Sequence, residues 1–252
     1  MGGSMVKGFL LSQTLQPADM VVSDASQQAL SAFQDTGVTT TTDNREAASW
    51  GDVVFVVVKP WLVEPVLQGV KPVMDYQRQT LVVVAAGVPS ADIAAWMRKD
   101  GEVAEPPLFL AIPNIAIAHK ASMTFLVPVH ASADQTECVK ALFDEVGQTI
   151  VTTEKLLPAG TALASCGIAY AMRYVRAASE GGVELGFKAA DAQRIVMQTM
   201  KGAVELLQAS GMHPEAAIDL VTTPGGVTIR GLNAMEEAGF THAVIHGLKA
   251  SK

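Results

Sequence analysis

The stretch Val53-Val-Phe-Val-Val-Val58, followed at once by Lys59-Pro60, decides the fold class of this chain. It is apolar at every position, as a strand is when both faces of its sheet are covered. Five further short runs share this character, at residues 20–23, 80–86, 108–112, 124–129 and 149–153, and helical patterns lie between them. This alternation predicts an α/β fold, in which helices cover a parallel sheet.

The pattern changes after about residue 154. From there the sequence shows long helical patterns rich in Ala, Met and Leu, over residues 156–185, 188–210, 213–222, 227–238 and 240–250. We therefore expect a sheet domain over residues 1–153 and an all-α domain over residues 154–252. The second helix carries Ile195, Met197, Met200, Val204 and Leu207 on loosely overlapping faces, which indicates either a subunit interface or a helix central to its own bundle.

Composition excludes several classes of function. The net charge is −7 and Lys and Arg do not cluster, whereas nucleic-acid binding needs a concentrated basic face. The longest apolar runs are far shorter than the roughly 20 residues that cross a membrane. Two cysteines, Cys138 and Cys166, without a secretory signal predict a reduced, cytoplasmic compartment. We interpret the i, i+4 pair His242 and His246 as a helix surface, and expect no metal.

Functional residues should follow the strands, because a parallel sheet binds its ligand at the C-terminal ends of the strands. Lys59 follows one strand, where its charge can meet a phosphate or a carboxamide; a solvated lysine before a helix-starting proline is the alternative. Gly87 and the pair Pro113-Asn114 follow two others. There the backbone can approach a flat ring closely, or the residues simply end their strands.

The chain opens with Met1-Gly2-Gly3-Ser4-Met5, which leads directly into an apolar helix. The free N–H groups and the dipole of such a helix start favour an anion, so the segment suits a pyrophosphate. A cloning remnant has the same appearance.

A further turn, Thr222-Thr-Pro-Gly-Gly-Val-Thr-Ile229, joins two helices. Two glycines before a helix start supply unpaired N–H groups, and the hydroxyls of Thr223 and Thr228 add donors and acceptors. We expect a small carboxylate to rest on the N–H groups of Gly225, Gly226 and Val227. A plain connection between helices seldom needs Pro-Gly-Gly between threonines, so we favour the functional interpretation.

Taken in order, these segments resemble the pyrroline-5-carboxylate reductases over essentially the whole chain. The strongest match is Val221-Thr-Thr-Pro-Gly-Gly-Val-Thr-Ile229, which is close to the family's hallmark. Supporting matches are Val58-Lys59-Pro60, Ala85-Ala86-Gly87-Val88, Pro113-Asn114, Thr161-Ala162-Leu163, Gly167 with Ala169-Tyr170, Gln198-Thr199, and Glu236 with Gly239-Phe240. Each match is weak alone, but their order and spacing are specific.

The resemblance implies reduction of 1-pyrroline-5-carboxylate to L-proline with NADPH or NADH, the last step of proline biosynthesis. It also implies a Rossmann-type sheet domain, an all-α dimerisation domain, a homodimer and often a ring of dimers. The cofactor carries the difficult step, so the protein mainly holds the ring and the nicotinamide face to face. No strong acid or base is required.

The resemblance and the glycine turn together assign residues to both halves of the site. Substrate-binding residues would be Glu154 beside the domain junction and Thr223, Gly225, Gly226, Val227 and Thr228 in the turn. Thr228 would be the catalytic residue, because its hydroxyl would reach the ring nitrogen. Cofactor-binding residues would be Gly2, Gly3, Ser23, Asp24, Asn44, Val58, Lys59, Pro60, Ala85, Ala86 and Asn114. Asp24 favours a 2′-hydroxyl over a 2′-phosphate, which leans the cofactor toward NADH.

The start of the chain departs from the family. The family begins with a strand and Gly-x-Gly-x-x-Gly, but Met1-Gly2 corresponds to the last two positions of that fingerprint, so the first strand is missing. We expect a start codon assigned too late. The alternative is a true variant with a damaged pyrophosphate site, a non-catalytic dimeric relative.

A second alternative is a different imine or β-hydroxyacid reductase of the same two-domain plan. The hydroxyacid enzymes of that plan use a lysine in the first long helix of their second domain. Residues 161–185 contain no lysine, so we place this alternative behind the proline enzyme.

Overall fold

The structure is a computed structural model that describes residues 1–12, 14–99 and 105–252. The chain divides into two compact units, Met1–Ser165 and Cys166–Lys252. Residues 154–165 are a connecting segment that belongs to the first compact unit. Our expectation that the dinucleotide-binding domain ends at residue 153 and the substrate-binding and dimerisation domain begins at residue 154 stays a prediction.

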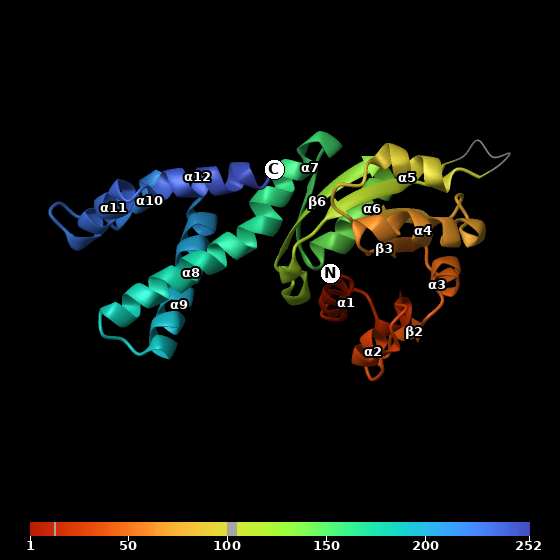
Figure 1. The fold of residues 1–252 in the computed structure, drawn as a ribbon, viewed down its shortest axis with the longest axis horizontal. Helices are drawn as coiled ribbons and strands as arrows, with labels where there is room; N and C mark the ends of the chain where they lie inside the picture. The colour runs from red at the N-terminus through yellow and green to blue at the C-terminus, as the bar shows by residue number, and fades with distance from the viewer. Residues whose placement is uncertain (13, 100–104) are drawn as a thin grey trace. The chain divides into compact units, whose positions relative to one another are not determined.

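The first unit contains two sheets (Figure 1). In the smaller one, β1 (Val21–Ser23) and β2 (Thr39–Thr41) are parallel. The larger sheet has the order β3-β4-β5-β6-β7. Its strands are β3 (Val53–Val56), β4 (Thr80–Val83), β5 (Leu108–Ile112), β6 (Ser122–Val129) and β7 (Gly147–Val151). All six predicted strands are therefore present, and β2 is an additional one.

One pairing differs from the parallel sheet that we expected. β5 and β6 are antiparallel, whereas the other neighbours in the larger sheet are parallel. The two strands are joined only by residues 113–121, which contain the short 3-10 helix η4 (Ile115–His119). A parallel crossover needs a dozen or more residues, so this connection reverses the chain.

Helices cover both faces of the larger sheet. On one face lie α4 (Pro60–Val70) and α5 (Ser90–Met97), and on the other α1 (Gly2–Leu10) and α6 (Ala133–Asp144). The first unit also contains α2 (Gln27–Leu30), α3 (Asn44–Trp50) and α7 (Leu157–Gly160). Alternate residues of β4 enter different cores: Leu81 packs in a cluster with α4 and α5, and Val82 in a cluster with α1 and α6. Burying each such side chain contributes about 1.5–3 kcal/mol, so the doubly covered sheet is the stable centre of this unit.

The second unit is all-helical, as predicted. It contains α8 (Gly167–Glu184), α9 (Ala189–Ser210), α10 (Pro214–Leu220), α11 (Val227–Glu237) and α12 (Phe240–Ala250). Helix α8 packs along α9, and α11 contacts α12 (Figure 1). The single helix predicted over residues 156–185 is wrong at its start, where η5 (Glu154–Leu156), α7 and the π-helical turn η6 (Thr161–Cys166) precede α8. Pro158 lacks an N–H group and fits only a first turn, so a new helix begins at Leu157.

The second unit buries no large side chain by itself. Within residues 166–252, all of which the structure describes, the buried apolar residues are Ala192 and Ala217. Ile195, Met197 and Val204 of α9 are 43%, 49% and 52% exposed. A helix at the centre of its own bundle would hide such residues, so that alternative is wrong and the subunit interface is favoured.

Two further findings concern membrane-spanning helices and metal sites. In the part of the chain that the structure describes, no helix combines the length and apolarity needed to cross a membrane. The rings of His242 and His246 stack with centroids 5.7 Å apart on α12. Across residues 1–12, 14–99 and 105–252, no three His, Cys, Asp or Glu side chains gather as metal ligands would.

Candidate active site

The N-terminal helix begins beside the end of β3. A Cβ placed on Gly2 would lie 3.8 Å from Cβ of Val57, the residue after this strand. Met5 and Phe9 hold the helix against the sheet. The first N–H groups of α1 have no intrahelical partners, so the helix presents donors near the C-terminal edge of the sheet. The predicted role of Gly2 and Gly3 beside a pyrophosphate stays a prediction.

Two of the predicted cofactor residues meet directly. Ser23 is the last residue of β1 and Asn44 is the first residue of α3, and the Ser23 hydroxyl donates to Asn44 Oδ1 at 2.7 Å. Asp24 follows Ser23, and its Oδ1 accepts from the N–H of Ser26 at 2.8 Å. One carboxylate oxygen of Asp24 is therefore held by the local turn, which fixes the orientation of this side chain.

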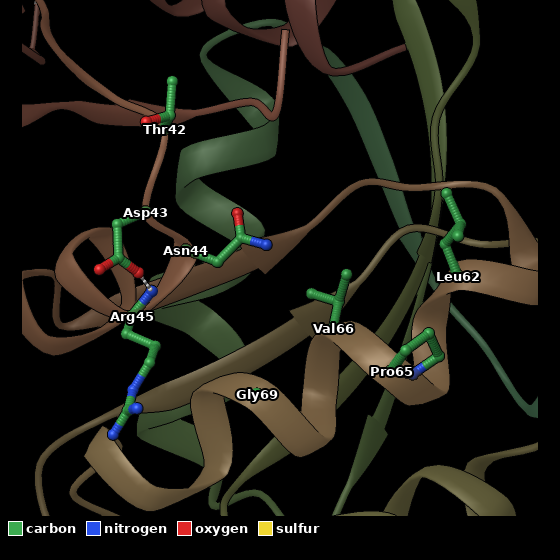
Figure 2. Close-up of a pocket in the computed structure, with 8 residues that line it drawn as sticks. All are labelled: Thr42, Asp43, Asn44, Arg45, Leu62, Pro65, Val66 and Gly69. Atoms are coloured by element: carbon green, nitrogen blue, oxygen red, sulfur yellow. Dashed lines mark hydrogen bonds between the residues drawn. The ribbon is translucent and has the colours of Figure 1, made fainter.

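A cavity of about 460 Å³ opens between α3 and α4 (Figure 2). Thr42, Asp43, Asn44 and Arg45 form its polar wall, and Leu62, Pro65, Val66 and Gly69 form the other. Figure 2 shows the Asn44 amide directed toward the Val66 side, while the Arg45 side chain extends away from Asn44. An apolar wall opposite hydrogen-bonding groups suits a flat ring that carries a sugar.

Sequence reasoning found only Asn44 among these lining residues. Leu62, Pro65 and Val66 were missed because apolar positions of a short helix look like core positions. Leu62 is 44% exposed, which marks it as a surface position, but its exposure is known only once the fold is known.

The loops after β3, β4 and β5 share one edge, because these three strands are parallel to one another. Lys59 is exposed and precedes α4, whose first residue is Pro60. After β4, Ala85 is buried, Ala86 is exposed, and Gly87 has a φ of +78°. The predicted residues Val58, Lys59, Pro60, Ala85 and Ala86 thus line the edge at which a parallel sheet binds its ligand.

The side chain of Asn114, which follows β5, is held by hydrogen bonds to other residues of the first unit. It is only 4% exposed, its Oδ1 accepts from the N–H of Ala116 at 3.0 Å, and its Nδ2 donates to the carbonyl of Ala164 at 3.5 Å. The side chain therefore ties the loop to the π-helical turn η6. A direct contact between Asn114 and a cofactor stays a prediction.

Glu154 also has protein partners. Its Oε1 accepts from the N–H of Ser90 at 2.9 Å and its Oε2 accepts from the Ser90 hydroxyl at 2.5 Å. Both carboxylate oxygens are thus bound within the first unit. The predicted contact of Glu154 with substrate stays a prediction, and its partner Ser90 was not found from the sequence.

The glycine turn of the second unit has a defined geometry. Gly226 N–H donates to the carbonyl of Thr223 at 3.0 Å, and Gly225 has a φ of +70°. With Pro224 in second place, these are the features of a type II β-turn over Thr223 to Gly226. Helix α11 follows directly, with Gly226 as its N-cap.

This geometry corrects one part of the predicted carboxylate seat. The N–H of Gly226 closes the turn, so it is not available to a ligand. The donors that remain are at the start of α11, where the N–H groups of Val227, Thr228 and Ile229 lack intrahelical partners. Within this fully described part of the chain, Gly226 gives α11 no side-chain cap and no acidic residue lies in its first turn. Val227 is 76% exposed, so the seat opens to solvent.

Comparisons with known proteins match both units of the chain. A family model described as pyrroline-5-carboxylate reductase dimerisation matches residues 154–252, and one described as NADP oxidoreductase, coenzyme F420-dependent, matches residues 1–87. Pyrroline-5-carboxylate reductase 1 of Dictyostelium discoideum is 36% identical over 100% of this chain, which spans about half (47%) of that protein.

Two further relatives match over most of their length. Pyrroline-5-carboxylate reductase 2 of Dictyostelium discoideum is 32% identical, over 100% of this chain and 87% of that protein. The solved structure of a pyrroline-5-carboxylate reductase from Coxiella burnetii is 26% identical, with a TM-score of 0.89 over 99% of this chain and 93% of that one. This chain therefore belongs to the pyrroline-5-carboxylate reductase family.

Proposed function

We propose that this chain is an NAD(P)H-dependent oxidoreductase that reduces 1-pyrroline-5-carboxylate to L-proline, the last step of proline biosynthesis. The observation that carries the proposal is the type II turn Thr223 to Gly226 placed directly before the uncapped helix α11. The family membership supplies the reaction, and the turn supplies a place for the substrate's carboxylate.

The substrate seat follows from the start of α11. Free N–H groups and the positive end of the helix dipole stabilise an anion there, typically by about 0.3–1 kcal/mol for the dipole at an exposed site. The N–H groups of Val227, Thr228 and Ile229 would hold the carboxylate. Gly225 makes this possible, because its left-handed backbone turns the chain so that the helix start faces outward.

Thr228 would act on the ring nitrogen. Hydride addition to a cyclic C=N needs that nitrogen to carry or receive a proton, and a hydroxyl within hydrogen-bonding distance polarises it. Thr228 lies on the first turn of α11 and is exposed. Thr228 would then hold the carboxylate through its N–H group and orient the ring through its hydroxyl.

The first unit fits a nicotinamide dinucleotide. The cavity between α3 and α4 combines an apolar wall with the Ser23-bonded amide of Asn44, which suits an adenosine. The start of α1 offers N–H groups for the pyrophosphate, and the loops with Lys59 and Ala86 lie at the ligand edge of the sheet. When bound, the cofactor supplies the hydride. The protein's part is to hold both rings in contact and to exclude water.

The exposed apolar face of α9 supports a homodimer, since the second unit hides no large side chain alone. The proposal also includes a ring of such dimers and a cytoplasmic location. It further includes a substrate-binding and dimerisation domain that begins at residue 154. A small cyclic imino acid is the substrate class, because the seat provides for one carboxylate.

The test is an assay of purified chain that follows NADPH and NADH loss with pyrroline-5-carboxylate. Removing the hydroxyl in Thr228→Ala should lower kcat by about tenfold or more, as for the loss of one transition-state hydrogen bond of a kcal/mol or two. Thr228→Ser keeps the hydroxyl and should retain most of the rate. The matched control is Thr136→Ala, which removes a helix hydroxyl that donates to the Ser132 carbonyl. An unchanged kcat in Thr228→Ala would refute the role of this hydroxyl.

A further inference from the structure

A hydrogen-bonded pair, Ser90 and Glu154, connects the start of α5 to the start of η5, and we refer to it as the Ser90–Glu154 clamp. The Glu154 carboxylate accepts from both the N–H and the hydroxyl of Ser90, at 2.9 Å and 2.5 Å. Both residues are partly buried. Hydrogen bonds to an ionised carboxylate are about twice as strong as neutral ones, and two of them fix the direction as well as the distance.

The clamp caps the N-terminus of helix α5. This helix begins at Ser90, and the residue before it is Pro89, whose side chain has no hydrogen-bond acceptor. The first N–H groups of the helix therefore lack the local cap that Ser, Thr, Asp or Asn would provide. Glu154 provides the cap from 64 residues further along the chain. Its negative charge also lies at the positive end of the helix dipole.

The glutamate side of the clamp is rigid. Glu154 is separated from the end of β7 by Thr152 and Thr153, and the N–H of Thr152 donates to the Leu126 carbonyl of β6 at 2.9 Å. Leu157, three residues later, packs against the core cluster on the α4 and α5 side of the sheet. The carboxylate is thus held from both sides by the sheet and the core.

The serine side of the clamp ends the loop after β4. At the other end of that loop, the N–H of Val84 donates to the Val56 carbonyl at 2.9 Å. Between these fixed points lie Ala86, which is exposed, and Gly87, whose added Cβ would meet nothing within 4 Å. Ala85 and Val88 pack with the core cluster on either side of these two residues, and the clamp adds a hydrogen-bonded restraint where the loop enters α5.

We propose that Ser90 is a positioning residue for the reductase reaction, acting through Glu154 to hold the loop of residues 85–87 against the nicotinamide dinucleotide. This inference rests on the proposed function, in which that loop lies along the cofactor. Precise placement of reacting groups matters because a misplacement of about 1 Å can cost about 100-fold in rate. In this role Ser90 acts through its bonds to Glu154 and not through a contact with the reacting groups.

The test compares Ser90→Ala, Ser90→Thr and Glu154→Gln in the full chain, with NADPH and NADH affinity measured by fluorescence titration without substrate. We expect Ser90→Ala to weaken cofactor binding by about three- to tenfold, because only part of the lost charge-assisted bond is felt in the cofactor loop, and Ser90→Thr to restore it. In the assay of Ser90→Ala, KM for the cofactor should rise while KM for pyrroline-5-carboxylate is unchanged. The double variant Ser90→Ala/Glu154→Gln should lose less than the two single losses combined, because both act on one pair.

The matched control is Ser132→Ala, which removes the hydroxyl that caps α6 through the N–H of Gln135, outside the proposed site. It should lower the melting temperature and leave cofactor affinity unchanged. If Ser90→Ala behaves in the same way, the serine is only a structural cap and the positioning role is overturned.

The titration also separates this inference from the proposed function. If the wild-type chain binds the cofactor but does not reduce pyrroline-5-carboxylate, the proposed function fails, while the affinity series still supports or overturns the clamp. If Thr228→Ala behaves as expected but Ser90→Ala binds the cofactor normally, only the clamp fails.

Discussion

Replacing Gly225 by alanine tests the substrate seat through its backbone. Gly225 has a φ of +70°, and a Cβ placed there would meet nothing within 4 Å, so the substitution adds strain without a clash. An L-residue in the left-handed region costs roughly 1–2 kcal/mol. The turn is exposed and can relax, and relaxation moves the N–H groups of α11 away from the carboxylate. Because 1.4 kcal/mol corresponds to tenfold, kcat/KM should fall by about 5- to 30-fold.

The assay is steady-state kinetics with pyrroline-5-carboxylate varied at saturating cofactor. We expect most of the loss of Gly225→Ala in KM for this substrate, with KM for NADPH or NADH unchanged. Gly225→Asn should recover most of the activity, since asparagine tolerates the left-handed conformation. Gly231→Ala is the control, because Gly231 lies inside α11 with open space around it. Equal losses in the alanine and asparagine variants would refute the backbone argument.

Three further predictions concern the cofactor, the core and the assembly. Asp24→Ser should raise the ratio of kcat/KM for NADPH over NADH by about tenfold, since it removes a charge that repels a 2′-phosphate, and an unchanged ratio would exclude Asp24 from this choice. Gly8→Ala should destabilise the first unit by about 1–3 kcal/mol or more in urea unfolding, because its Cβ would lie 2.2 Å from the Ile117 carbonyl oxygen. Ile195→Glu should shift the chain toward monomer in light scattering, since it puts a charge on the exposed apolar face of α9; a dimer of undiminished affinity would place the interface elsewhere.

The strands were predictable where burial alone determines the sequence. The runs that became β3, β4 and β5 are apolar because both faces are covered, and this pattern needs no knowledge of partners. β2 was missed because its residues, Thr39–Thr41, are half-buried or exposed at a small sheet. The antiparallel pairing of β6 depends on the length of the connection rather than on the strand, so the strand pattern could not show it.

The candidate site could be predicted only in part from the sequence. The resemblance, rather than local chemistry, placed Ser23 and Asn44 near the cofactor; the structure joins the two side chains by a hydrogen bond, and their contact with a cofactor stays a prediction. The partner of Glu154 was not predictable, because the contact with Ser90 is created only when the sheet brings two distant loops together. The N–H of Gly226 was assigned to a ligand because its use within the turn depends on the φ of Gly225, which residue types alone do not specify.

The helical unit without a large buried side chain has a consequence for how this protein becomes stable. The apolar side chains of such a unit become buried only when a second chain covers them, so its folding and its dimerisation are coupled. The native population of such a segment depends on how many chains are present, and the melting temperature should rise with protein concentration. Newly made subunits would then remain vulnerable to proteolysis until they meet, and the amount of chain produced would itself set how much of it survives.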